Sequence, residues 1–235
     1  IGVLALLGSK RRHRLLLLAI NLLATTTGQE VVPTVAGLLL FGRDERVAEL
    51  LPRAAVLVTR FSGDSLQSPV VERVKLTGNL LTLYESVTRF ISRYCDLREQ
   101  RPKGSLLNDS EESPVPARAN HHRGVVLEAV ANLLAHRDLA LRDLPSRVHV
   151  FDRSLEFVNS RRSAGFSPVA QKAIRYGVPQ RLNPQLSAML TSGAYGLNLP
   201  LRGLPEMLRQ SKLFSGRRAE IVSFNDEFRL RLYGA

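Results

Sequence analysis

Three polar side chains recur at intervals of four residues within one apolar stretch, and their chemical types suit nucleotide chemistry. They are Glu128, Asn132 and His136, which share one face if the stretch is a helix. A carboxylate can act as a general base toward water, and an amide oxygen can ligate the Mg²⁺ that bridges phosphates. The spacing by itself favours a plainer interpretation, in which these residues form a solvated helix face that ends at His136 and Asp138.

The segments around these residues are typical of a mixed helix and strand domain. Residues 124–136 predict a helix, because apolar side chains accompany the polar stripe. Residues 147–158 predict two strands that meet near Asp152. Residues 219–224 and 227–233 predict a second hairpin.

The first hundred residues contain helix and strand signals of their own. Residues 15–23 predict a helix that ends at Gly28, and residues 33–42 predict a short buried helix. Residues 55–61 predict a strand, and residues 79–94 predict an amphipathic helix. The apolar face of that helix would consist of Leu80, Leu83, Val87, Phe90 and Ile91. After it, residues 96–119 are rich in proline and polar residues, which favours a linker or mobile loop.

The composition excludes several classes of protein. The chain has 235 residues, 44% of them hydrophobic, which is enough to bury a core. Its single cysteine, Cys95, excludes a disulfide-stapled secreted scaffold and fits the cytoplasm. The apolar segment 1–24 is interrupted by basic residues, so that neither half could cross a bilayer. We therefore expect a cytoplasmic protein with no membrane partner, and the initial Ile1 indicates a fragment of a longer chain.

The net charge leaves DNA binding open. A formal charge of +12 favours an acidic partner such as DNA. However, only five of the 33 basic residues are lysine, and a GC-rich coding sequence produces the same excess of arginine. The sequence contains no Gly-x-x-x-x-Gly-Lys-Ser/Thr phosphate loop, so we do not expect helicase activity.

An ordered set of short motifs gives the chain a family resemblance. In chain order they are Thr34–Gly42, Arg60–Gly63, Thr77–Leu80, Glu128–Asp138 and Arg181–Pro184. Together they resemble the family of RecG-related, Schlafen AlbA-type transcriptional regulators, over roughly residues 33 to 235. The resemblance implies an α/β (α+β type) fold that ends in a GHKL-like ATP-binding module, a two-layer sandwich with helices on one face of a mixed sheet.

The resemblance also implies a division of the chain. Residues 1–30 would be a helical remnant of an upstream region, and residues 31–95 a small α/β unit. Residues 96–119 would link that unit to the GHKL-like domain, residues 120–235.

The resemblance assigns roles to the polar helix. Glu128 would stand where the general base of such ATPases stands, and Asn132 where their Mg²⁺-binding amide stands. The motif His136-Arg137-Asp138, the most specific part of the resemblance, would supply further cofactor contacts.

Residues beyond this helix complete the implied ATP site. Asn159 and Gly165 would lie on the adenine side, and Gly203, before a short helix, on the phosphate side. The sequence departs from the family at the first of these loops, where Asn-Pro-Gly has become Asn159-Ser160-Arg161.

Two kinds of function fit these observations. The first is an ATP-binding module, with ATP hydrolysis left open, that switches a DNA-associated transcriptional regulator with ATP and Mg²⁺ as cofactors. The second is a non-catalytic regulator or homodimer scaffold with a degenerate nucleotide site and a basic surface for nucleic acid. A third possibility is a structural remnant that binds neither.

Overall fold

The core of the protein is a mixed β-sheet. The computed structural model describes residues 18, 21–101, 118–139, 144–160, 183–192, 197, 203–224 and 227–235. Within these ranges, a six-stranded sheet has the order β4-β3-β7-β8-β10-β9. Its strands are β3 (Val56–Phe61), β4 (Val70–Leu76), β7 (Ser146–Val150), β8 (Ser154–Ser160), β9 (Glu220–Phe224) and β10 (Glu227–Tyr233). Strands β3 and β7 are parallel, and every other neighbouring pair is antiparallel.

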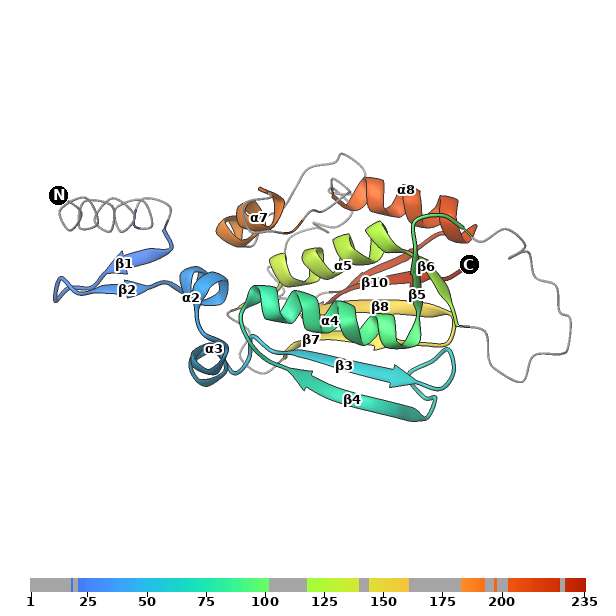
Figure 1. The fold of residues 1–235 in the computed structure, drawn as a ribbon, viewed down its shortest axis with the longest axis horizontal. Helices are drawn as coiled ribbons and strands as arrows, with labels where there is room; N and C mark the ends of the chain where they lie inside the picture. The colour runs from blue at the N-terminus through green and yellow to red at the C-terminus, as the bar shows by residue number, and fades with distance from the viewer. Residues whose placement is uncertain are drawn as a thin grey trace, which may run out of the picture.

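Helices cover one face of this sheet. Helices α4 (Leu80–Tyr94), α5 (Arg123–Ala135) and α8 (Leu204–Ser215) lie side by side on it, with α5 in the middle (Figure 1). Because α5 has neighbours on both sides as well as the sheet beneath it, nearly all of its residues are buried. The expected fold class, a two-layer sandwich with helices on one face of a mixed sheet, is confirmed.

Several elements expected from the sequence are present. Helix α4 begins after Asn79, whose side chain accepts a hydrogen bond from the Thr82 amide at 3.0 Å, and its predicted apolar face is buried. Strand β3 and the hairpin of β7 and β8 also agree with the expectation. Strands β9 and β10 form the second hairpin, although residues 225 and 226 between them lie outside the described ranges.

Helix α2 (Val35–Phe41) confirms the expected short helix, although it is only partly buried, at Gly37, Leu39 and Leu40. The Thr34 side chain accepts a hydrogen bond from the Gly37 amide at 3.1 Å and so caps the helix. Gly37 lies against the preceding chain, since a Cβ atom there would stand 2.0 Å from the Leu22 carbonyl oxygen. Helix α3 (Asp44–Leu50), which follows it, was not anticipated.

The helix expected at 15–23 does not extend to its predicted end. Leu18 is helical, but the chain turns at Asn21, and β1 (Leu23–Thr25) then pairs antiparallel with β2 (Val31–Pro33). Asn21 and Gln29 have positive φ angles of 57° and 61°, which suit turns. The run of β-branched threonines at 25–27 favours an extended chain over a helix.

The expected boundary between two domains does not divide the sheet. Strands β3 and β4 come from the expected small unit, yet β3 pairs with β7 from the expected C-terminal domain. A continuous cluster of buried apolar residues joins α4 to α5 and the sheet. The start of the expected linker is β5 (Asp96–Arg98), which pairs with β6 (Asn120–His122), while residues 102–117 lie outside the described ranges. Residues before and after the linker therefore share one core.

No helix in the described part of the chain has the length and apolar character needed to cross a membrane.

Candidate functional site

Glu128 points from the central helix α5 toward the start of α8. The residue is only 7% exposed. One carboxylate oxygen, Oε1, accepts a hydrogen bond from the Gly203 amide at 3.1 Å, and the other, Oε2, is buried without a hydrogen-bond partner. Burial raises the pKa of Glu128, and the hydrogen bond from Gly203 partly opposes that rise. The carboxyl group is therefore more basic than an ordinary glutamate.

Gly203 is the residue that precedes α8. Its φ of 89° favours glycine, and a Cβ atom at this position would meet no other atom within 4 Å. No side chain from α8 itself caps the helix. Instead, the Glu128 carboxylate accepts a hydrogen bond from a backbone N–H group at the start of α8. The structure thus brings together Glu128 and Gly203, which are 75 residues apart in the sequence.

Tyr84 on α4 belongs to the same environment and was missed by sequence reasoning. It is 8% exposed, and its pKa is raised to about 12 by burial, with a further contribution from the charge of Glu128. The helical periodicity of residues 79–94 would have placed Tyr84 on the buried face beside Leu83 and Val87. Its hydroxyl remains protonated over the physiological pH range.

Asn132 lies one helical turn beyond Glu128. It is half-buried, in contrast to the buried residues on either side of it. Its backbone carbonyl accepts a hydrogen bond from the His136 amide at 3.0 Å, which completes the last turn of α5. The expected pair of a carboxylate and an amide on one side of a helix is therefore present.

The His136-Arg137-Asp138 motif is at the C-terminal end of α5, about 12 Å along the helix axis from Glu128. His136 is the C-cap residue, and Arg137 is buried with a guanidinium nitrogen donating to the Ala54 carbonyl. The Asn183 amide donates to the carbonyls of Ala135 and Arg137, at 2.9 and 2.8 Å. Arg137 therefore lies apart from the Glu128 carboxylate.

Asn159 braces the sheet against α5. Its side-chain oxygen accepts a hydrogen bond from the Ser146 hydroxyl at 2.6 Å, and its nitrogen donates to the Leu133 carbonyl at 2.9 Å. Both ends of the Asn159 side chain are therefore already hydrogen-bonded within the protein, where they join β8 to β7 and α5. Gly165, the other residue expected on the adenine side, lies outside the described ranges.

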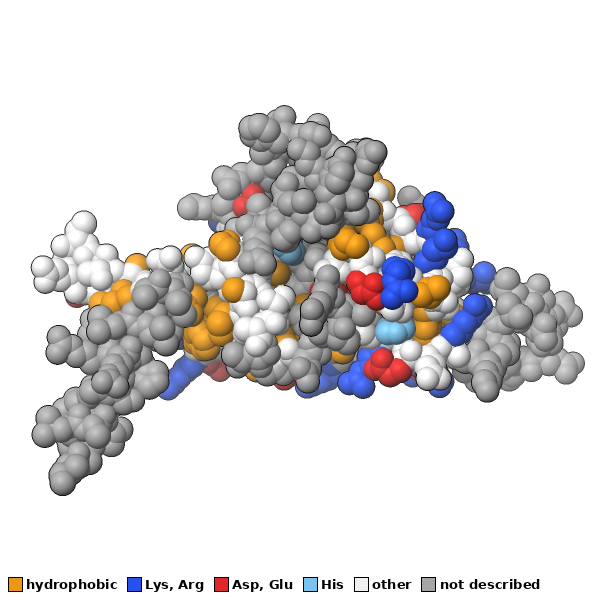
Figure 2. Space-filling model, turned by 90° about the horizontal axis from the view of Figure 1, so that it is seen from above, with side chains coloured by type: hydrophobic (Ala, Val, Ile, Leu, Met, Phe, Trp, Pro, Cys, Tyr) orange, Lys and Arg blue, Asp and Glu red, His pale blue; other side chains and the backbone are white. Residues whose placement is uncertain are grey.

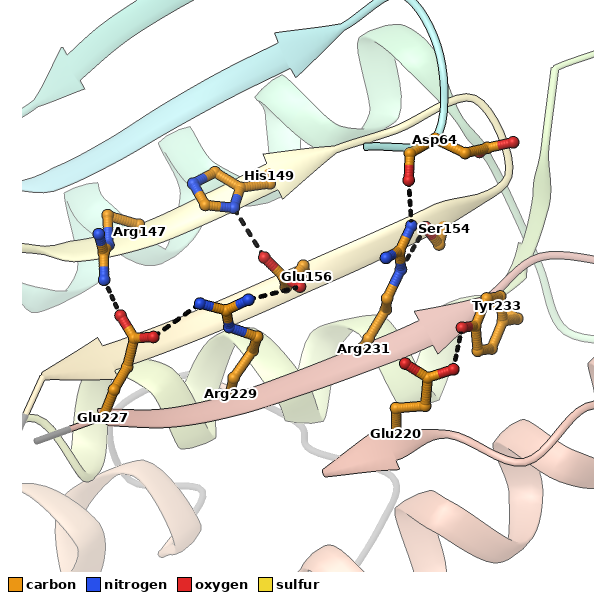
Figure 3. Close-up of polar contacts among 10 residues, drawn as sticks. All are labelled: Asp64, Arg147, His149, Ser154, Glu156, Glu220, Glu227, Arg229, Arg231 and Tyr233. Carbon is orange, nitrogen blue, oxygen red and sulfur yellow. Dashed lines mark hydrogen bonds and ion pairs between the residues drawn. The ribbon is translucent and has the colours of Figure 1, made fainter. Parts of the chain in front are cut away.

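The opposite face of the sheet carries a network of charged side chains (Figure 3). His149 and Glu156 are 2.9 Å apart, and Arg229 lies 3.8 Å from the second oxygen of Glu156. Arg229 also pairs with Glu227 at 2.8 Å, and Glu227 pairs with Arg147. Burial raises the pKa of Glu156, but the His149 hydrogen bond and the charge of Arg229 outweigh burial, so that the pKa is lowered. Sequence reasoning missed this network, although alternation along the strands could have indicated it.

A third arginine extends the network toward the end of β10. Arg231 donates to the Ser154 hydroxyl at 2.9 Å and to the Asp64 carbonyl at 2.6 Å (Figure 3). Its guanidinium group also lies over the Phe151 ring. The arginines on this face are therefore engaged with partners from the protein itself. No three His, Cys, Asp or Glu side chains gather as a metal site in the parts of the chain that the structure describes.

The fold and these contacts define a class of protein, a two-layer α/β sandwich with a buried glutamate between α5 and α8. No protein-family model matches the chain. No curated protein matches it either. The fold is similar to the crystal structure of the DIP2311 protein from Corynebacterium diphtheriae, with a TM-score of 0.59 and 17% sequence identity. The match covers 94% of this chain and 40% of that chain, so the present chain spans less than half of that protein. This similarity supports the fold and does not assign a function.

Proposed function

We propose that this chain is a GHKL-like ATP-binding module of a RecG-related, DNA-associated transcriptional regulator of the cytoplasm. One observation carries the proposal. The buried carboxylate of Glu128 has one oxygen without a partner and stands at the start of α8, with Asn132 one turn away. These are the groups that binding and activating a nucleotide would require.

Each group has a distinct part in this proposal. The Asn132 side-chain oxygen would ligate Mg²⁺, which accepts oxygen ligands and bridges phosphates. The free oxygen of Glu128 would orient a water molecule, and the raised pKa of its carboxyl group would make it a better proton acceptor. The backbone N–H groups at the start of α8 would face the phosphates.

The geometry makes Mg²⁺ essential to this proposal. The Glu128 carboxylate already binds the Gly203 amide, so phosphates approaching α8 would meet a negative charge. A divalent cation between the two would offset that repulsion. Nucleotide without metal is therefore expected to bind weakly or not at all.

A thermal-shift titration tests the proposal. ATP, ADP and GTP would be added with Mg²⁺ or with EDTA, since a ligand that binds only the folded state raises the midpoint. We expect ATP to raise it only with Mg²⁺, and Asn132→Ala to abolish the rise. Glu128→Gln should keep binding and lose any hydrolysis. Glu85→Gln, which changes an exposed glutamate on α4, is the matched control. Indifference of the wild type to every nucleotide would refute the proposal.

The second candidate, a scaffold that contacts nucleic acid, is favoured by basic side chains near the end of α8. Figure 2 shows such side chains gathered at that end of the molecule. The exposed ones on and after α8 are Arg209, Lys212, Arg217 and Arg218. Binding to duplex DNA would have to weaken steeply with salt, and Arg217→Ala with Arg218→Ala should reduce that slope. DNA binding insensitive to salt would exclude this surface as a phosphate-binding site.

A further inference from the structure

Arg137 is a buried charge with unused hydrogen-bonding capacity. The residue is 4% exposed, and Nη1 donates to the Ala54 carbonyl. Its other two nitrogens, Nε and Nη2, are buried without a hydrogen-bond partner. Burial lowers the pKa of Arg137 to about 10, so the group is still charged at neutral pH. Burying an unpaired charge is costly, and an anion beside it would offset that cost.

The same residue lines a cavity of about 960 Å³. The cavity lies where β7 begins and β8 ends, and it is bounded by residues of α2, α3 and α7 (Pro184–Thr191). Its volume falls within the range of small-molecule binding sites. Its walls combine apolar and polar side chains, among them Leu50, Leu51, Leu186, Ser146, Ser160 and Asn183.

The unused donors have the geometry of an anion-binding fork. Nε–H and Nη2–H lie on one edge of the planar guanidinium group and point in parallel, which matches the two oxygens of a carboxylate or phosphate. Two carboxylates, Glu49 and Asp138, also line the cavity, but neither bonds to this edge of Arg137. Glu49 is paired with Arg46 at 2.5 Å, and Arg53 adds a second basic group to the lining.

We propose that this cavity binds a small organic anion. Because Nε and Nη2 of Arg137 are closed off from solvent in the free protein, the guanidinium group would turn on binding so that this edge meets the carboxylate or phosphate group, while an apolar body lies against Leu50, Leu51 and Leu186. The site goes beyond the proposed nucleotide site, because Arg137 supplies the positive charge and no metal ion is needed. It is also separate in space, since it lies beyond the C-terminal end of α5.

The test is a thermal-shift titration of the whole chain in the presence of EDTA, without added metal. It uses two anionic probes that share the same apolar chain. Hexanoate and hexyl phosphate each carry one candidate anionic group, hexanol carries neither, and inorganic phosphate lacks the apolar body. We expect at least one of the two amphiphilic anions to raise the unfolding midpoint, while hexanol does not. Whichever anion raises it more identifies the preferred anionic group.

Variants connect that binding to Arg137. Arg137→Met removes an unpaired buried charge and should still fold, while affinity for the anion falls roughly ten- to hundred-fold. If Arg137→Met proves unstable, Arg137→Lys replaces it in the test. It keeps the positive charge without the planar pair of donors, and it should also bind the anion more weakly than the wild type. Arg93→Met, which removes an exposed arginine of α4, is the matched control and should bind like the wild type. Asn132→Ala should also bind like the wild type, because it alters only the nucleotide site.

Several results would overturn the proposal. Wild-type protein that responds to neither anion at millimolar concentration has no such site. An equal rise of the unfolding midpoint with hexanol would mean that the cavity binds apolar chains and does not recognise the anionic group. If Arg137→Met and Arg93→Met lowered the affinity for the anion equally, the anion would be bound by nonspecific attraction to positive charge. Weakening by Asn132→Ala would mean that the anion occupies the nucleotide site. Failure of ATP to bind would not affect any of these comparisons.

Discussion

Replacing Asn159 with alanine should destabilise the protein substantially, because this side chain holds three elements together. It accepts from Ser146 on β7 and donates to Leu133 on α5, and it is 3% exposed. Each hydrogen bond contributes about 1 kcal/mol net, and a buried partner left without one costs about 1–3 kcal/mol. We therefore expect Asn159→Ala to lower the free energy of unfolding by about 2–4 kcal/mol.

Urea unfolding of the variant and the wild type measures this difference directly. The matched control is Asn120→Ala, because among the described residues the Asn120 side chain on β6 is hydrogen-bonded to Arg98 alone, at 2.7 Å and near the surface. That change should cost no more than about 1 kcal/mol. If Asn159→Ala unfolds at the same urea concentration as the wild type yet binds ATP poorly, Asn159 would be a ligand contact and the structural role argued above would be wrong.

Three further predictions follow from the same contacts. Gly37→Ala should destabilise the protein by about 2 kcal/mol or more in urea, since the new Cβ would stand 2.0 Å from the Leu22 carbonyl, although alanine normally favours helices. Asp44→Ala should cost about 1–2 kcal/mol in the same assay, because the Asp44 carboxylate accepts from the Asn79 amide at 2.7 Å at the start of α4. The stability of the wild type should fall as pH rises from about 4.5 through the raised pKa of Glu128, because the folded state keeps a proton that the unfolded state releases. Glu128→Gln should remove that part of the pH dependence in urea unfolding measured across this range.

Local patterns in the sequence were sufficient for the elements whose signals lie within one segment. The periodic apolar residues and the cap at Asn79 identified α4, and the apolar run after residue 123 identified α5. Edge strand β4 was missed because it is largely exposed or half-buried and carries charges along its length. The turn at Asn21 was missed because the preceding apolar run continues smoothly into residues that the structure places in β1.

Contacts between distant segments could not be obtained in this way. The parallel pairing of β3 with β7 joins residues 90 positions apart, such as Val56 and Ser146, and no local signal specifies it. The same holds for Glu128 and Gly203, which the family resemblance named separately and the fold brings into contact. The unpaired, buried nitrogens of Arg137 could not be predicted from the sequence either, because they depend on which distant segments surround the side chain.

The most direct test of the nucleotide site is isothermal titration of ATP into the whole chain, with Mg²⁺ and then with EDTA, for the wild type and Asn132→Ala. We expect saturable heat for the wild type with Mg²⁺ and none with EDTA, and none for Asn132→Ala under either condition. Binding that persists unchanged in EDTA and in Asn132→Ala would contradict this expectation, because the nucleotide would then be held by groups other than Asn132 and its metal.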